Sequence, residues 1–187
     1  MRHHTRILIG ITTAAFALAT LACVASDKPK SDEAGDKAIA DSAKMIAQNL
    51  TKFDTLDFDI FSNQKWDRLK ESHAADITVS WPDGHDTHGI EKHIEDLKAM
   101  FIAMPDLSIK EHPIKIANGH WTSVVGRMTG TFSQPMPLGG GKMMQPNGKK
   151  LDLTMSTIGH WTDAGVMDHE WLFWDNQTFM KQLGLIP

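Results

Sequence analysis

The side chains able to do chemistry in this 187-residue chain are few in kind. It contains ten His residues and 23 Asp and Glu residues, but a single Cys, Cys23, and no Tyr. One Cys excludes a disulfide framework, a Cys-rich zinc site and a paired-cysteine redox motif. No phenol is available as an acid, base or oxyanion donor. Any catalysis would therefore use carboxylates, imidazoles, hydroxyls or indoles.

The densest group of such side chains lies between positions 83 and 93. It consists of Asp83, His85, Asp86, His88 and His93. Imidazoles and carboxylates at this density are typical of zinc or copper sites. However, His85 and His88 fall in a predicted turn and His93 on the following helix, so no i, i+4 pair shares a helical face. We therefore favour a solvated loop and predict no metal site.

A second group occupies the run 169–175, which is predicted to be a strand. Alternate residues of a strand share a face. One face then carries His169, Trp171, Phe173 and Asp175, and the other carries Glu170, Leu172 and Trp174. Two alternatives stay open: Asp175 is a pocket residue or the N-cap of the last helix, and Glu170 is a functional group or a solvent-facing or ion-paired strand residue.

Hydrophobic periodicity predicts the elements that position these groups. The predicted helices are 38–52, 64–72, 89–103 and 177–183, and the predicted strands are 75–81, 107–116, 121–132, 150–161 and 166–175. This order indicates an α+β fold, in which N-terminal helices pack on a curved, mainly antiparallel sheet. The Met- and Gly-rich loop 133–148 is either a flap over an apolar pocket or a hairpin tip.

Four stretches together resemble the SnoaL-like polyketide cyclase and ester cyclase family. The closing run 169–184 has the family's Glu-Trp, an Asp four residues after the Trp, and a helix ending in Gln-Leu-Gly. The other three, in the family's order, are Met-Pro-Asp-Leu at 104–107, Gly-Arg-Met-Thr-Gly-Thr at 126–131 and Pro-Asn-Gly-Lys at 146–149. The resemblance covers about 38–185.

This resemblance implies the cone of the nuclear transport factor 2-like superfamily, in which a curved sheet and packed helices enclose an apolar pocket. Its polyketide cyclases close a ring by intramolecular aldol condensation without a metal or organic cofactor. The Asp that matches Asp175 is their general acid/base. Many relatives carry a His where Phe132 stands, so that part of the pocket has become apolar here.

On this basis we predict Asp175 and His169 as catalytic residues. The predicted substrate-binding residues are Trp171, Phe173, Trp81, Trp121 and Phe132. The predicted function is cofactor-free acid/base chemistry on a carbonyl compound, of the isomerase, cyclase or hydratase type. The alternative is a non-catalytic periplasmic module that binds or carries an apolar ligand.

The N-terminus predicts export. A basic start precedes an uncharged run, Ile7 to Leu21, of 15 residues. That run is shorter than the ~20 residues of a membrane span but suits a secretory signal. It ends in Thr-Leu-Ala-Cys, which resembles a bacterial lipoprotein signal. We predict a signal peptide 1–22, lipidation of Cys23, a flexible tether 23–37 and one domain 38–187 in the periplasm; the alternative is cleavage after Ala25 and free secretion.

The charge balance limits the partners. Nineteen Lys and Arg stand against 23 Asp and Glu, a net charge of -4, and the basic residues are not clustered. This excludes a nucleic-acid or polybasic membrane partner, because neutralising phosphates requires clustered positive charge. The expected partners are a small apolar organic ligand, a membrane through the lipid anchor alone, and, as a candidate, a second copy in a homodimer.

Overall fold

The computed structural model describes residues 32–187. The predicted signal peptide, Cys23 and the first part of the tether lie outside these residues. In the part of the chain that is described, no helix is both long and apolar enough to cross a membrane.

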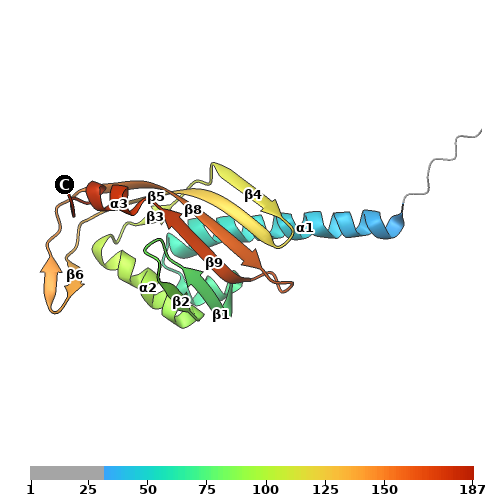
Figure 1. Cartoon of the computed structure of the whole chain (residues 1–187), viewed down its shortest axis with the longest axis horizontal. Helices are drawn as coiled ribbons and strands as arrows, with labels where there is room; N and C mark the ends of the chain where they lie inside the picture. Colours follow the sequence, from blue (N-terminus) through green and yellow to red (C-terminus); the bar gives the residue numbers. More distant parts are fainter. Residues whose placement is uncertain (1–31) are drawn as a thin grey trace, which may run out of the picture. The chain divides into compact units, whose positions relative to one another are not determined.

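A seven-stranded sheet organises the domain (Figure 1). Its strands are β1 His73–Ser80, β2 Asp86–His88, β3 Ser108–Ile109, β4 Ile114–Asn118, β5 Trp121–Thr131, β8 Lys150–Trp161 and β9 Met167–Trp174. The order is β2-β1-β9-β8-β5-β3, with β4 also paired to β5. Only the β1–β9 pair is parallel among these described pairs. The prediction of an α+β fold with a curved, mainly antiparallel sheet is confirmed.

Helical segments precede and interrupt the sheet. They are α1 Glu33–Thr55, the π-helical η1 Leu56–Phe61, the 3-10 helix η2 Trp66–Glu71, α2 Ile90–Ala103 and α3 Asn176–Gln182. Helix α1 starts five residues before the predicted position, so the prediction of a tether over 33–37 is wrong. Glu33 and Asp36 lie in the first turn, where negative charge is favourable at a helix N-terminus. This first turn of α1 is exposed and has no apolar periodicity, so the sequence pattern does not reveal that the helix begins there.

Two strand predictions need correction. The predicted strand 107–116 is divided into β3 and β4, because Pro113 has no N–H to donate to a sheet ladder. The segment between them carries His112. Strand β2, predicted as a turn, pairs with β1 through the register Val79 to Thr87.

The loop 133–148 forms a separate hairpin of β6 Met136–Gly139 and β7 Lys142–Met144 (Figure 1). Its turn holds Gly140 and Gly141, both with positive φ, which glycine adopts without steric cost. Met136 and Met144 pack against the core, but no residue of the hairpin lines the cavity described below. Of the two alternatives, the hairpin is therefore the one observed.

The sheet has one buried and one exposed face. Along β8, buried Leu151, Leu153 and Met155 alternate with more exposed residues. The buried face packs against η1 and α2, and Trp161 at the end of β8 is fully buried. This alternation is expected of an antiparallel sheet covered on one side, and it decides which side chains of β9 reach the interior.

Candidate functional site

A small cavity of about 40 Å³ lies between the buried face of the sheet and the helices. It has room for about two water molecules. Its wall is mostly apolar and contains Met100, Met128 and Met155. The polar side chains in the wall are Asp57, His73, His93, Thr157 and Glu170. A few polar groups in an apolar wall are typical of small-molecule sites.

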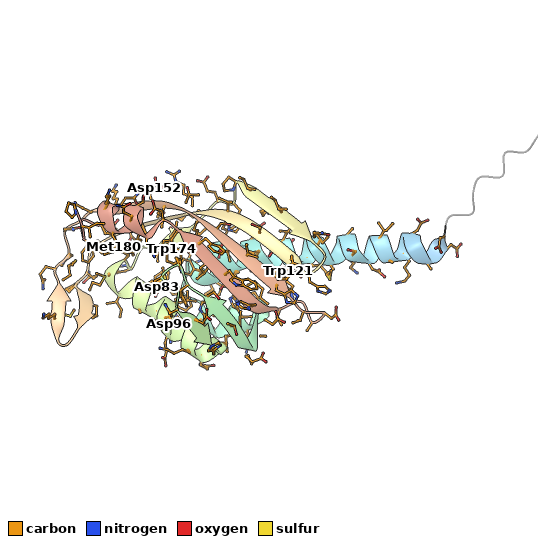
Figure 2. All side chains as sticks on the ribbon, in the orientation of Figure 1. Asp83, Asp96, Trp121, Asp152, Trp174 and Met180 are labelled. Carbon is orange, nitrogen blue, oxygen red and sulfur yellow. The ribbon has the colours of Figure 1, made fainter. Side chains whose placement is uncertain are left out.

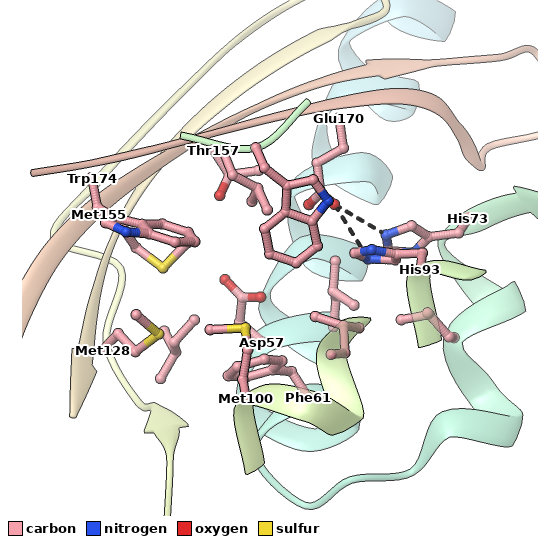
Figure 3. A pocket seen from close by; sticks show the side chains of 16 residues that line it. Asp57, Phe61, His73, His93, Met100, Met128, Met155, Thr157, Glu170 and Trp174 are labelled. Atoms are coloured by element: carbon pink, nitrogen blue, oxygen red, sulfur yellow. Dashed lines mark ion pairs between the residues drawn. The ribbon is translucent and has the colours of Figure 1, made fainter. Parts of the chain in front are cut away.

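Glu170 of β9 faces two imidazoles on one side of this cavity (Figure 3). Its Oε2 lies 3.5 Å from Nε2 of His73 in β1 and 3.6 Å from Nε2 of His93 in α2. The two rings stack with centroids 5.3 Å apart. All three residues are at most 5% exposed. Elements distant in the sequence therefore bring three buried titratable groups together.

Burial sets the protonation of this cluster. It lowers the pKa of His93 to about 4, since an imidazolium there would lose its solvation. Burial alone would raise the pKa of Glu170, but the interactions with His73 and His93 outweigh it and the pKa lies below its ordinary value. Glu170 is therefore a carboxylate at neutral pH and His93 a neutral imidazole.

Asp57 reaches the cavity from η1 and has its own partner. Nε2 of His112 donates to its Oδ2 at 2.8 Å, and Nδ1 of His112 donates to Oδ1 of Asp54 at 2.8 Å. Lys115 donates to the other oxygen of Asp54 at 2.7 Å. Asp54 is about one third exposed. A hydrogen-bonded chain thus runs from the cavity to the surface.

Burial and hydrogen bonds shift the pKa values of Asp57 and His112. Burial raises the pKa of Asp57, an effect that the hydrogen bond from His112 only partly offsets and to which the charge of Glu170 adds. Burial would lower the pKa of His112, but its hydrogen bonds to Asp57 and Asp54 outweigh this and raise it. Both groups therefore hold a proton at a higher pH than in water, and the hydrogen bond between them is a path along which a proton can pass.

Local backbone structure explains how Asp57 enters the cavity. The π-helical turn follows α1 without a break, and π-helical insertions are frequent at functional sites. They alter the side-chain direction relative to a regular α-helix. In η1, the turn places Leu56, Ile60 and Phe61 in the core and Asp57 in the cavity wall.

The faces of β9 are the reverse of the predicted ones. Glu170, Leu172 and Trp174 line the cavity. His169, Trp171 and Phe173 do share a face, but it is the outer one, where Phe173 is 49% exposed. His169 stacks on Trp171 with centroids 3.6 Å apart, and its Nε2 lies 3.2 Å from Oγ of Ser80. The cavity therefore does not contain these predicted residues.

Asp175 also lies outside the cavity, as the N-cap of α3. Its carboxylate accepts hydrogen bonds from the backbone N–H groups of Gln177 and Thr178 and from the Thr178 hydroxyl. These bonds lower its pKa, the opposite of what a general acid/base near neutrality needs. His169 is six residues away along an extended strand, roughly 20 Å. The structure thus does not bring the predicted catalytic pair together.

The other predicted pocket residues divide three ways. Trp81 lines the cavity, and its indole donates to Thr87 at 2.9 Å. Phe132 is buried in the core but is not part of the cavity wall. Trp121 is 49% exposed and stacks against Trp171 on the outer face at 5.7 Å. Trp121 and Trp174 lie toward opposite ends of the sheet (Figure 2).

The histidines between positions 83 and 93 also divide between the surface and the cavity wall. His85 and His88 are exposed, and His85 binds Asp83 at 2.5 Å and stacks on Trp81. His93 points away from them into the cavity. Among the described residues, the metal-competent grouping is His73, His93 and Glu170, not the loop.

Comparison with known proteins agrees with this architecture. The family model for SnoaL-like polyketide cyclase matches residues 53–183, and the chain belongs to that family. A putative SnoaL-like polyketide cyclase from Jannaschia sp. CCS1 has a TM-score of 0.65 and 22% identity, covering 75% of this chain and 94% of that one. IdmH, a putative polyketide cyclase from Streptomyces antibioticus, has a TM-score of 0.62 and 20% identity, covering 73% and 99%.

A third structure, a putative polyketide cyclase from Xanthomonas campestris pv. campestris, has a TM-score of 0.62 and 15% identity, with coverage of 75% and 97%. No curated protein sequence matches the chain. The family and its small-molecule pocket fold are therefore shown, while identities this low support the fold alone.

Some of the cavity residues that the sequence analysis missed do have a signal in the sequence, and others do not. His93 shares the apolar stripe of α2 with Leu97 and Phe101, and all three are buried. Asp57 stands among apolar residues at the end of α1, where periodicity predicts no helix. His112 gives no such signal, because its role depends on a break between strands that is visible only in the fold.

Proposed function

We propose that the chain binds a small organic carbonyl compound in this cavity and that Asp57 acts on it as general acid/base. The observation that carries the proposal is a buried carboxyl in an apolar wall, with raised pKa, linked through His112 to the surface. Removing a proton next to a carbonyl requires a base held close to the acidic carbon and shielded from water. Asp57 meets this requirement better than Asp175.

The cavity must enlarge to admit such a ligand, since 40 Å³ is far below the roughly 300 Å³ of a small drug site. Met100, Met128 and Met155 supply the means, because methionine side chains are flexible and repack at low cost. In Figure 3, Met128 and Met155 lie on the side of the cavity away from His73 and His93. Ligand entry therefore need not disturb the imidazoles.

Proton–deuterium exchange tests the proposal without knowledge of the natural substrate. The probes are small cyclic ketones and β-diketones in D₂O, followed by ¹H NMR. We expect Asp57→Asn to slow exchange by about 10²-fold or more, as loss of a general base does. Because the pKa of Asp57 is raised, the activity of the wild type should fall with acidification at a higher pH than for an ordinary carboxylate.

The matched control is Asp175→Asn, which retains a side-chain cap. It should exchange at the wild-type rate, and Asp57→Asn should still bind the uncharged apolar fluorophore Nile red as the wild type does. Undiminished exchange in Asp57→Asn, or an equal loss in Asp175→Asn, would refute the role of Asp57. The ionisable side chains that interact with Asp57 are His112, Glu170 and His73.

A second candidate is a non-catalytic binding or carrier module for an apolar ligand. It is favoured by one observation: the residue that matches the family's acid/base, Asp175, is an exposed helix cap. In that case the wild type binds apolar probes but exchanges no ketone above the buffer rate. Both candidates share the cavity, and the exchange assay separates them.

Export and lipidation complete the proposal. They are supported by the basic start, the apolar run and the single Cys at its end. Expression in a bacterial host should place the wild type in the detergent phase on Triton X-114 partitioning, and Cys23→Ser in the aqueous phase. Equal partitioning of the two proteins would contradict lipidation at Cys23.

A further inference from the structure

Three buried ligand atoms converge on one side of the cavity. They are Nε2 of His73, Nε2 of His93 and Oε2 of Glu170, from β1, α2 and β9. The candidate ligand atoms all lie within 4.8 Å of one another (Figure 3). We propose that these three side chains bind one zinc ion, with its remaining coordination position open to the cavity. This goes beyond the proposed acid/base function and does not depend on it.

The distances favour a shared ion over direct pairing. A charge-assisted hydrogen bond between an imidazole and a carboxylate spans about 2.7–2.9 Å. The observed separations are 3.5 and 3.6 Å. Zinc with bonds of about 2.0–2.1 Å separates its tetrahedral ligands by ~3.3–3.4 Å, whereas octahedral ligands would lie ~2.9 Å apart. The two measured separations are therefore close to the edges of a zinc tetrahedron.

The partners of Ser72 fix the direction of the His73 lone pair. The Ser72 hydroxyl lies 3.2 Å from the Leu69 carbonyl oxygen and 2.9 Å from Nδ1 of His73. Since a carbonyl cannot donate, both bonds form together only if Ser72 donates to Leu69 and accepts from Nδ1–H. Metal-binding histidines have their second nitrogen held in this way. Nε2 then faces Glu170 with a cation, either a proton or a metal ion, required between them.

The remaining hydrogen-bond potential of the cluster is unused. Nε2 of His73 and Nδ1 of His93 are buried without a hydrogen-bond partner. A buried polar nitrogen left in this state costs about 1–3 kcal/mol. A zinc ion would satisfy Nε2 of His73 directly. It would also balance the charge of the Glu170 carboxylate, which lies in the cavity wall.

The donor set and the separations together favour zinc. Two imidazoles and one carboxylate are the ligands of catalytic zinc and of non-haem iron(II), whereas oxygen-preferring Ca²⁺ or Mg²⁺ would not choose them. The separations of 3.5 and 3.6 Å fit the tetrahedral geometry of zinc better than the octahedral geometry of iron(II). The open position faces a space of about 40 Å³, enough for a water or a ligand oxygen. An ion there would polarise a bound carbonyl oxygen or a water molecule.

Metal uptake by the untagged chain tests this directly. After dialysis against a chelator and its removal, titration with zinc sulfate in a calorimeter should show one site per chain. Cobalt(II) in its place should give the strong visible bands of a four-coordinate ion. Zinc should also raise the melting temperature, because it binds the folded state. Absence of stoichiometric uptake by the wild type overturns the proposal without any variant.

Variants locate the site. Glu170→Gln, nearly identical in shape, should abolish the single-site binding, and Ser72→Ala should weaken it about 10- to 100-fold, as loss of a supporting contact does. The controls His85→Ala and His169→Ala remove imidazoles outside the cluster and should bind as the wild type does. Equal loss in the controls, or wild-type affinity in a correctly folded Glu170→Gln, refutes the assignment. Asp57→Asn should retain zinc, which keeps this test separate from that of the proposed function.

Discussion

The two faces of the sheet carry the same kinds of side chain in opposite environments. On the inner face, Glu170 and Trp174 line a small cavity together with buried imidazoles. On the outer face, His169, Trp171 and Trp121 form a stacked row that reaches solvent. Water solvates the outer groups, whereas the inner ones must find partners within the protein. Burial, more than residue type, therefore marks the side chains suited to chemistry.

The two faces should differ most in how much stability the protein loses when a tryptophan is replaced by alanine. Trp161 is fully buried, and its indole donates to Thr122 at 2.9 Å. Trp161→Ala should lower the free energy of unfolding by about 3–5 kcal/mol. Trp121→Ala, at the outer position, should cost about 1 kcal/mol from lost stacking. Urea denaturation of both variants measures the contrast, and equal losses would contradict the assignment of faces.

A smaller effect is expected from a single added methyl group on the inner face. A Cβ at Gly159 would lie 2.5 Å from the sulfur of Met167, which is fully buried. Gly159→Ala should therefore destabilise by about 1–3 kcal/mol through overpacking. On the outer face, Ser156→Ala should stay within about 0.5 kcal/mol. Thermal unfolding of the two variants is the measurement; a neutral Gly159→Ala would mean that Met167 can move aside.

Sequence patterns predicted the architecture well because amphipathic periodicity is local. The stripe of α2 and the alternation of β8 each reveal which side is buried. Strand β9 lacks that contrast: each of its faces carries one polar residue, His169 or Glu170, and two large apolar residues, so the pattern does not choose between them. The choice is made by pairing with β8 and by the layer of helices, which no single segment encodes.

The candidate site was harder to predict, since its parts come from five separate segments. Glu170 acquires its partners from β1 and α2, and Asp57 acquires His112 from the break between β3 and β4. The family motif points to Asp175, whose sequence context also fits a helix cap. Only the burial of each carboxyl distinguishes the two roles.

The pH dependence of stability separates a buried ion network from surface pairs. The pKa of His112 is raised in the folded state, so its stabilisation is fully present below the unfolded value of 6.5 and is lost as pH rises through the folded value. The charged groups facing it are Asp54 and Asp57, with Lys115 behind Asp54. The stability difference between wild type and His112→Gln should shrink as pH rises above 6.5 in urea titrations. Parallel curves would show that the ring contributes by packing alone.

The smallest expected effect concerns Asp175 and bears on which face holds the chemistry. As a cap it satisfies the N–H groups of Gln177 and Thr178, so Asp175→Ala should cost about 1 kcal/mol and Asp175→Asn only a few tenths, because Asn also caps well. Differential scanning calorimetry can resolve the pair. A cap has no reason to affect ketone exchange, so Asp175→Asn should leave that rate unchanged. A different result would contradict this: Asp175→Asn could be as stable as the wild type and yet lose ketone exchange. In that case α3 must move in solution to bring the carboxylate into the cavity. The division between a structural outer face and a reactive inner face would then fail at this residue.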